Sequence, residues 1–230
     1  FTLKRTKDRF LAICMLVLSL LVFVSLLAPV IAPFDPYRQS CSAFQAPNMI
    51  HLLGCNDVGQ DLFSELLYGG RISLFIGLFA AFYATIISTV VGLFSGYLGG
   101  TVDRFFMRVI DVVMALPFLP LIIVLGAFIG PGFGTQIFVI VLVMWAHSAR
   151  ELRSQVLKIR ECDFIKVSVS MGSTPQAVIF RHILPELMPL VIPQFIRIAQ
   201  SAVLIESSLS FLGLGNPTLK SWGSILFFAN

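Results

Sequence analysis

The chain has 230 residues, of which 57% are hydrophobic and only 12% carry a charge. An ordinary soluble domain is about 45–50% apolar and about 25% charged, and a soluble globule of this size cannot hide such an excess of apolar surface. The composition excludes a disordered chain, a coiled coil and a disulfide-rich secreted module, and it favours a membrane protein. The net charge is only +4 and the basic residues lie between apolar runs, which argues against a nucleic-acid-binding protein.

Five apolar segments predict membrane spans, because about 20 helical residues cross the hydrocarbon core of a bilayer, which is about 30 Å thick. The first segment is too long for a cleaved signal peptide, and the fourth is shorter than the others. A further apolar run begins at Trp222 and predicts the start of a sixth span. The sequence starts at Phe1 and stops within this run, so we expect a fragment of a longer chain. The five spans are predicted at Phe10–Ala32, Ile72–Leu98, Phe105–Ile129, Thr135–Ala149 and Leu187–Leu212.

The predicted fold is therefore an all-α, polytopic transmembrane helical bundle, and its lysines and arginines indicate its orientation. Cytoplasmic loops carry an excess of these two residue types. With a cytoplasmic N-terminus, twelve of them lie on the inner side and only three, Arg38, Arg71 and Lys220, lie on the outer side. We therefore expect the N-terminus in the cytoplasm.

A hydrophilic segment between the fourth and fifth spans, Arg150–Glu186, predicts two short helices joined at an elbow. The first helix, Asp163–Met171, ends at Gly172, because glycine adopts backbone angles that other residues resist. The second helix follows at once: a serine or threonine caps it, a glutamine closes a capping box with the serine, and a proline fits its first turn. Pro185 is expected to end this helix. The residues of the turn are Ser173, Thr174, Pro175 and Gln176.

The second helix of the elbow carries apolar and basic residues together, among them Ile179, Phe180 and Arg181. Two interpretations stay open on physical grounds. The elbow either docks into a groove on a cytoplasmic partner or packs against its own helical bundle.

The elbow resembles the EAA loop found in the permease subunits of ABC importers. In that loop a Glu-Ala-Ala triplet precedes a glycine, and an Ile-x-Leu-Pro string follows. Here Gly172 is followed ten residues later by His182-Ile183-Leu184-Pro185. Lys166, Val167 and Ser168 stand in place of Glu-Ala-Ala, and Lys166 reverses the charge expected there.

Four other stretches resemble the branch of this family that serves dipeptides, oligopeptides and nickel. They occur in the family's order and on the predicted sides of the membrane. Cys55, Asn56 and Gln60 depart from the family's "H-P-L-G-T-D-x-x-G-R-D" in the first stretch. The four stretches are His51–Asp61, Tyr68–Leu74, Asp103–Pro117 and Ser208–Gly223.

The resemblance implies a type I ABC importer permease with several partners. A homologous second permease subunit, two cytoplasmic ATP-binding subunits and an extracytoplasmic substrate-binding protein are expected, together with membrane lipid and no nucleic acid. The sequence has no Gly-x-x-x-x-Gly-Lys-Ser/Thr phosphate loop. ATP and Mg²⁺ are therefore expected in partner subunits, and this chain is expected to be no enzyme and to hold no cofactor. The residues expected to couple to the ATPases are Lys166, Gly172, Ser173, Thr174, Pro175, Gln176, Leu184 and Pro185.

The resemblance also divides the chain into regions within a prokaryotic plasma (inner) membrane. Residues 1–33 are the cytoplasmic N-terminus and first span, residues 34–70 an extracytoplasmic loop, and residues 71–230 a permease core with a coupling loop at 150–186. The chain is expected to form half of the translocation path for peptides or a similar small solute, and to couple through residues 163–185. The sequence does not identify the cargo.

Two charged residues of the fifth span, Arg197 and Glu206, are candidates for the translocation path, because charges within a membrane are costly and mark a pathway or a pair. They lie nine residues apart, about 13 Å along a helix, so they cannot pair with each other. Structural hydrogen bonds are the other interpretation. The same residues support an alternative function, an ion-gradient-driven secondary transporter or a channel that uses Glu206 and Arg197. A non-transporting membrane anchor is a third possibility.

Two of the four cysteines, Cys41 and Cys55, lie in the predicted outer loop. The space outside a cell membrane is commonly oxidising, so a disulfide between them is one expectation and free thiols are the other. With His51 the two cysteines offer metal ligands, but their spacing fits no standard zinc pattern, so no metal site is predicted.

Overall fold

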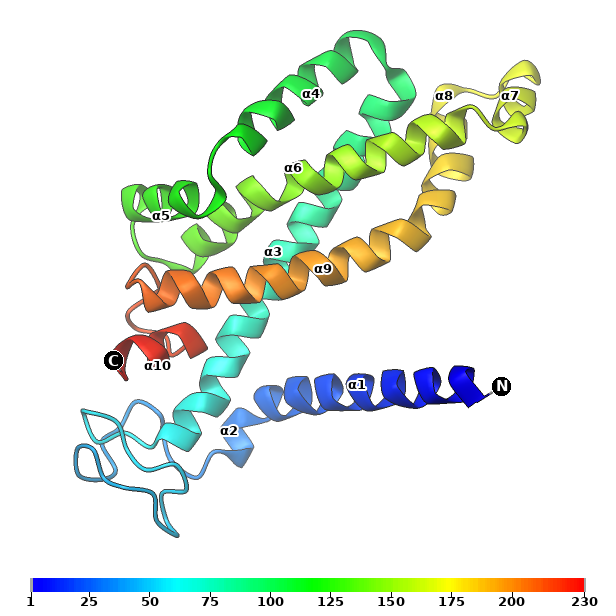
Figure 1. The fold of residues 1–230 in the computed structure, drawn as a ribbon. Helices are drawn as coiled ribbons and strands as arrows, with labels where there is room; N and C mark the ends of the chain where they lie inside the picture. Colours follow the sequence, from blue (N-terminus) through cyan, green and yellow to red (C-terminus); the bar gives the residue numbers. More distant parts are fainter. Residues whose placement is uncertain (1, 230) are drawn as a thin grey trace. The chain divides into compact units, whose positions relative to one another are not determined.

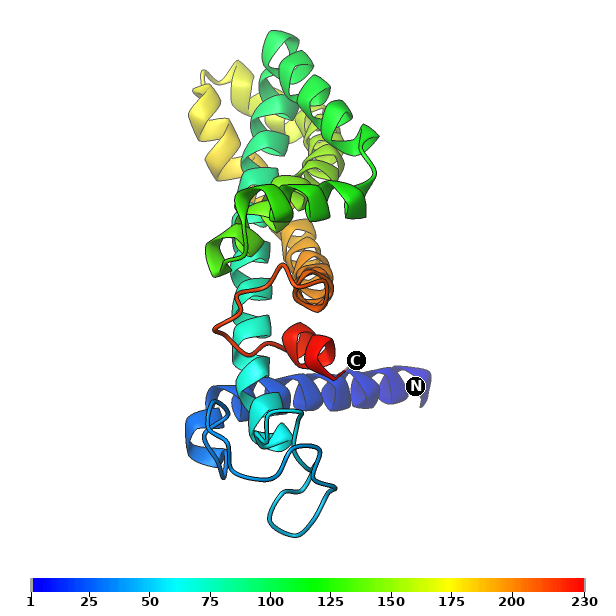
Figure 2. The same ribbon diagram turned by 90° about the vertical axis from the view of Figure 1, so that its left-hand side faces the viewer.

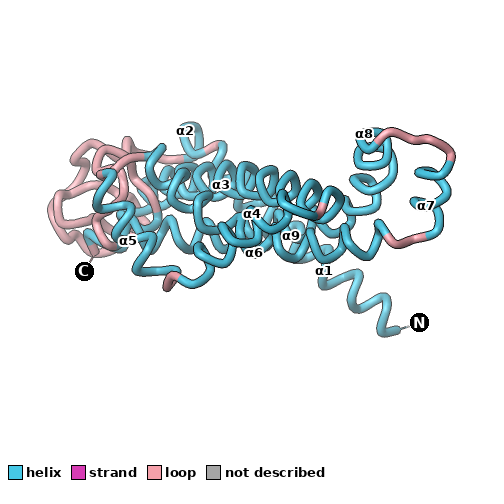
Figure 3. The backbone as a smooth tube through the Cα atoms, turned by 90° about the horizontal axis from the view of Figure 1, so that it is seen from above, coloured by secondary structure: helices cyan, strands magenta, loops and turns pink. Residues whose placement is uncertain are grey.

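The computed structural model describes the backbone of residues 2–229 and the side chains of residues 12–229. This part of the chain consists of helices and loops without a named strand, which confirms the all-α prediction (Figure 3). It forms two compact units: the first comprises the chain up to Phe75 and from Glu206 onward, and the second is Ile76–Ile205. The helices are α1 (Thr2–Leu26), α2 (Ala28–Ile31), α3 (Leu62–Leu98), α4 (Gly100–Ala115), α5 (Phe118–Ile129), α6 (Phe133–Arg160), α7 (Asp163–Ser170), α8 (Pro175–Val178), a π-helical turn (Ile179–Ile183), α9 (Leu184–Phe211) and α10 (Trp222–Phe228).

Three described helices are long and apolar enough to cross a membrane, namely α3, α6 and the continuous helix Pro175–Phe211 (Figure 1). The pair α4 and α5 passes the same test jointly. The apolar stretch of α1 with described side chains, Ala12–Leu26, is shorter than a span, and the side chains of the first two residues of the predicted first span lie outside the described part. The chain is therefore a multi-pass membrane protein.

The predicted third span is not one straight helix. It divides into α4 and α5, which meet at an angle of 91°. Leu116 is extended (ψ 139°) and Pro117 caps α5, because the proline ring disfavours helical angles in the residue before it. The prediction of a single span at Phe105–Ile129 missed this break, although Leu116-Pro117 was its signal.

The predicted cytoplasmic loop is mostly helical. Helix α6 continues to Arg160, well past the predicted end of the fourth span. The prediction that Pro185 ends the second elbow helix is wrong, since the helix runs on into α9. A π-helical turn precedes this proline, and its wider winding accommodates a residue that lacks an N–H and whose ring crowds the preceding turn.

Close packing of α3 on α6 holds the second unit together. A Cβ atom at Gly92 would lie 2.8 Å from Cβ of Leu152, and one at Gly96 would lie 2.7 Å from Cβ of Val156. Both distances are below van der Waals contact, so only glycine allows the helices to approach this closely. The Gly-x-x-x-Gly spacing therefore serves as a packing motif.

In the first unit, α10 packs against the beginning of α3 (Figure 2). Ser221 caps α10 through a capping box with Ser224. The indole N–H of Trp222 donates to the Leu66 carbonyl at 3.1 Å, and its backbone N–H donates to Ser73 Oγ at 3.2 Å. These bonds fix the start of α10 on α3.

Candidate functional site

The elbow is a helix, a turn and a second helix, as predicted, and Thr174, one of the two predicted caps, caps the second helix. Gly172 has φ +84°, in the left-handed region that favours glycine. The Thr174 hydroxyl accepts the Ala177 N–H at 3.3 Å. The expected capping box between Ser173 and Gln176 is absent from this turn. Ser173 instead accepts a hydrogen bond from Ser168 Oγ at 2.9 Å, which joins the turn to α7.

The inner face of the elbow belongs to a hydrophobic core. Ile165 of α7 and the buried residues that follow Thr174 pack on α6 and on Leu93 of α3. Burying one such side chain stabilises the packed state by about 1.5–3 kcal/mol. The inner face of the elbow is therefore packed against α6 and the beginning of α9. The other buried members of this core are Leu152, Val156, Val178, Ile179, Ile183, Leu187 and Val191.

The outer face of the elbow exposes a second set of large apolar side chains. No helix of the described second unit covers these residues. Exposed apolar clusters of this kind mark interaction surfaces. A groove of about 570 Å³ borders the elbow, and Val169 lines it together with Tyr97, Arg160 and Lys166. Lys166 lies 3.6 Å from Glu161, so a lysine at this position is paired with a neighbouring carboxylate. The exposed apolar residues are Phe164, Val167, Val169, Met171 and Phe180. The elbow thus packs on its own bundle with one face and presents an apolar surface with the other.

Two ion pairs tie α4 to α6. Arg153 donates to both carboxylate oxygens of Asp103, which also accepts from Ser95 Oγ on α3. Arg150 pairs with Asp111, about two turns further along α4 than Asp103. These pairs hold the amphipathic α4 beside α6, although the two helices are separated in sequence by the bend at Pro117.

Replacing Arg153 with methionine should lower the free energy of unfolding by about 1–2 kcal/mol, because it leaves the Asp103 carboxylate without its cation. The effect is modest since both side chains remain partly hydrated, at 25% and 18% exposure. Denaturant unfolding in micelles, followed by Trp145 fluorescence in a Trp222→Phe background, measures it. A double-mutant cycle with Asp103→Asn should give a coupling of similar size, and a coupling near zero contradicts the role of the pair.

Arg197, a candidate for the translocation path, has partners on α6. Its Nη2 atom lies 2.7 Å from Oε2 of Glu151. Gln194 donates to the same carboxylate at 2.9 Å, and His147 Nε2 lies 2.9 Å from its other oxygen. Sequence reasoning missed Glu151 as the centre of this cluster, although the i,i+4 spacing of His147 and Glu151 was a signal.

Glu206, the other candidate for the path, is fully buried. Its carboxylate accepts the Ser210 hydroxyl at 2.7 Å, one helical turn further on. Arg197 and Glu206 therefore each have their own polar contacts, and their role in a path stays a prediction.

The predicted outer loop, between α2 and α3, is held by a disulfide and by a buried ion pair. Cys41 and Cys55 form the disulfide, with their Cα atoms 6.5 Å apart. Lys220 Nζ lies 2.7 Å from Oε1 of Glu65 and donates to Gln60 Oε1 at 2.8 Å. The Glu65 side chain is only 2% exposed. This pair was not predicted, because its members are far apart in sequence and neither belongs to a periodic pattern.

Comparison with known proteins places these features in a family. Residues 88–227 match the family described as "Binding-protein-dependent transport system inner membrane component". The dipeptide transport system permease protein DppC of Bacillus subtilis (strain 168) is 36% identical over 223 residues, which cover 96% of this chain and 70% of that protein. The oligopeptide transport system permease protein OppC of the same organism is 30% identical, with 92% and 70% coverage. The glutathione transport system permease protein GsiD of Pectobacterium atrosepticum is 33% identical, with 90% and 70% coverage.

The match extends over most of the second unit and over α10, and the relatives align along nearly the whole chain. Members of this family are permease components of ABC importers, in which separate subunits hydrolyse ATP. The apolar helices, the elbow and these alignments lead to one assignment: the chain belongs to the binding-protein-dependent transport system inner membrane components and is a membrane permease subunit of an ABC importer.

Proposed function

We propose that this chain forms one half of a translocation path and receives its motion from ATPase subunits through residues 163–185. The observation that supports this most strongly is the two-faced elbow. Its inner face packs into the core shared by α3, α6 and α9, and its outer face exposes apolar side chains beside a groove. A partner that pushes on the outer face therefore displaces the long helices.

The proposed partners are a homologous second permease, two cytoplasmic ATP-binding subunits and an extracytoplasmic substrate-binding protein. ATP and Mg²⁺ belong to the ATP-binding subunits in this scheme, and no cofactor is assigned to this chain. The apolar residues on the outer face of the elbow are the contact surface for an ATPase subunit, with Lys166 and Gly172–Gln176 beside it. Leu184 and Pro185 connect this surface to α9.

The proposed cargo is a peptide or a similar small solute. The relatives carry the words dipeptide, oligopeptide and glutathione in their names, and all three describe small peptides. The half-exposed cluster of Arg197 and Glu151 is proposed to border the path, and the buried Glu206 to support its wall.

Purification of the chain in mild detergent, followed by mass spectrometry of what accompanies it, tests the assembly. Two ATPase subunits with phosphate loops and a second permease should be recovered. A variant with Met171→Asp and Val167→Asp should lose the ATPase subunits, since it places charges on the apolar outer face, and should retain the second permease. Recovery of the chain alone from the unaltered protein contradicts the proposed assembly.

The proposed orientation places the N-terminus and the elbow in the cytoplasm. Cys162 is exposed at the start of the elbow, so a membrane-impermeant maleimide should label it only after the cells are permeabilised. Met49→Cys is the matched control, because Met49 lies in the outer loop and is 97% exposed, and its thiol should react in intact cells. Equal labelling of Cys162 in intact and permeabilised cells contradicts this orientation.

A further inference from the structure

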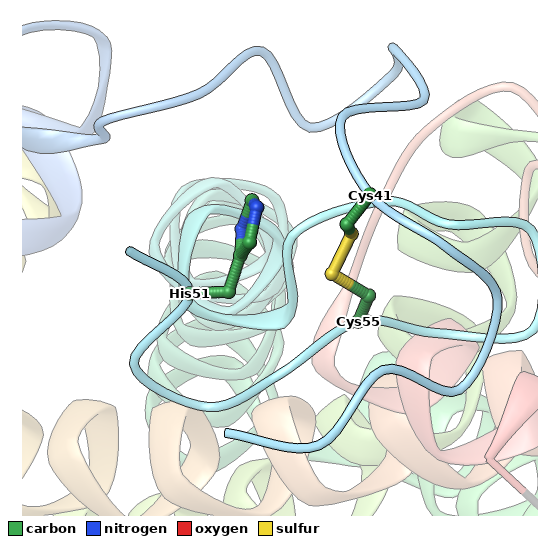
Figure 4. Close-up of side chains that lie close together, drawn as sticks. All are labelled: Cys41, His51 and Cys55. Atoms are coloured by element: carbon green, nitrogen blue, oxygen red, sulfur yellow. A yellow bond between two sulfur atoms is a disulfide. The ribbon is translucent and has the colours of Figure 1, made fainter. Parts of the chain in front are cut away.

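Three potential metal ligands converge in the outer loop. The Sγ atoms of Cys41 and Cys55 and a ring nitrogen of His51 all lie within 4.8 Å of one another (Figure 4). It is the one group of its kind among the residues that the structure describes. The two sulfur atoms are joined in the disulfide, so the group is complete only when that bond is reduced.

The imidazole of His51 is hydrogen-bonded to a carboxylate, as the imidazoles of metal-binding histidines commonly are. Its Nδ1 atom lies 2.9 Å from Oδ1 of Asp61. The other oxygen of Asp61 accepts the backbone N–H of Ser64 at 2.9 Å and its hydroxyl at 2.7 Å. A carboxylate that accepts from Nδ1 fixes the tautomer with the lone pair on Nε2, and this arrangement recurs behind histidines that bind metals.

Burial of the group favours a small ion with one open position. His51 and Cys55 are about 5% exposed, and the ring of Phe34 lies 4.6 Å from that of His51, centre to centre. Cys41 is only partly buried and provides access from solvent. Three protein ligands with one solvent position is a known tetrahedral arrangement for Zn²⁺.

We propose that the reduced outer loop binds one thiophilic divalent cation, of the Zn²⁺ type, through Cys41 Sγ, Cys55 Sγ and His51 Nε2. Bonds of about 2.3 Å to sulfur and about 2.0 Å to nitrogen separate tetrahedral ligand atoms by about 3.5 Å. The present spacing therefore requires ligand shifts of about 1 Å. Disulfide and bound cation are alternative states of the same two sulfur atoms, and both close the loop between residues 41 and 55.

The chemistry of the exchange balances with a dithiol as reductant. The dithiol supplies two electrons and two protons, the Cys41–Cys55 bond breaks to give two thiols, and the dithiol becomes a disulfide. The cation then displaces the two thiol protons, and two thiolates and the neutral His51 imidazole bind it.

Cobalt titration of the full chain in detergent tests the site. A Cys14→Ser, Cys162→Ser background removes the other two thiols. The chain is reduced with a dithiol, freed of it by gel filtration without oxygen, and titrated with Co²⁺. One equivalent should bind, with thiolate-to-cobalt absorption and the intense visible bands of tetrahedral Co²⁺, and Zn²⁺ should displace it. The oxidised chain should show neither.

Variants distinguish Co²⁺ binding that needs His51 and Asp61 from binding by two neighbouring thiols alone. Asp61→Asn should weaken Co²⁺ binding about 10–100-fold, as loss of an outer-shell partner does. His51→Asn should abolish the tetrahedral spectrum, and His182→Asn, a histidine of the elbow, should leave it unchanged. Re-formation of the Cys41–Cys55 disulfide on oxidation shows that a variant loop is folded. The proposal is overturned if the reduced chain binds no Co²⁺, or if a foldable His51→Asn variant gives the unaltered spectrum and affinity.

Discussion

Replacing Gly172 with valine should reduce ATP-driven transport about tenfold while the permease still assembles with its partners. Gly172 has φ +84°, and an ideal Cβ atom there meets nothing within 4 Å, so valine introduces backbone strain without a steric clash. A left-handed conformation costs an ordinary residue about 1–2 kcal/mol, and 1.4 kcal/mol corresponds to a factor of ten. The turn relieves this strain by changing its backbone angles, which moves α7 relative to α8. Uptake and ATP hydrolysis by the reconstituted transporter measure the loss of coupling.

Gly130→Val is the matched control for this substitution. Gly130 also has a positive φ, +99°, and also has open space around an added Cβ atom, but it lies in the turn between α5 and α6. Both variants therefore place a β-branched residue in a backbone conformation that favours glycine, at different places in the chain. Equal losses of transport in both, or normal coupling in Gly172→Val, contradict the special role of the elbow.

Replacing Lys220 with methionine should lower the free energy of unfolding of the first unit by about 3–5 kcal/mol. The Glu65 carboxylate is 2% exposed, and its ion pair with Lys220 offsets the cost of burying it. Removal of one partner from a buried pair leaves an uncompensated charge and has an effect of about this size. Fluorescence of Trp222, which is hydrogen-bonded to α3, reports the unfolding in a Trp145→Phe background.

Two controls accompany Lys220→Met. Arg38→Met removes a cation from the ion pair that Arg38 forms with Asp35 in the loop between α2 and α3. The two side chains of that pair are 84% and 48% exposed, so the loss should change the free energy of unfolding by less than about 0.5 kcal/mol. The double variant Lys220→Met, Glu65→Gln should recover part of the lost stability, because no charge is left buried. No recovery, or an effect as small as that of Arg38→Met, contradicts the assigned role of Lys220.

The sequence predicts well those features that depend on neighbouring residues. Long apolar runs gave α3, α6 and α9 because apolar helices suit a bilayer, and Gly172 marked the elbow because its left-handed backbone angles favour glycine. Helix ends were less predictable. Pro185 is a helix breaker in isolation, but the π-helical turn before it and the buried contacts of Leu187 keep the helix continuous.

Features that depend on distant residues could not be predicted. The pair Lys220–Glu65 joins a loop before α10 to the first turn of α3, and the pair Arg153–Asp103 joins α6 to α4. Charge complementarity is visible in a sequence, but many lysines and carboxylates meet that condition, and only the packed helices select the partners. The same reasoning applies to Arg197, for which a partner was expected but Glu151 was not identified.

The most direct test of the central claim is solute uptake by the complete transporter in proteoliposomes, measured with isotopically labelled di- and oligopeptides. Uptake should require ATP on the elbow side, stop with vanadate, and persist when ionophores abolish all ion gradients. The alternative of a secondary transporter predicts uptake that an imposed ion gradient drives without ATP and that Glu206→Gln abolishes. Gradient-driven uptake without ATP would contradict the account, whereas ATP-driven uptake that Gly172→Val impairs would support it.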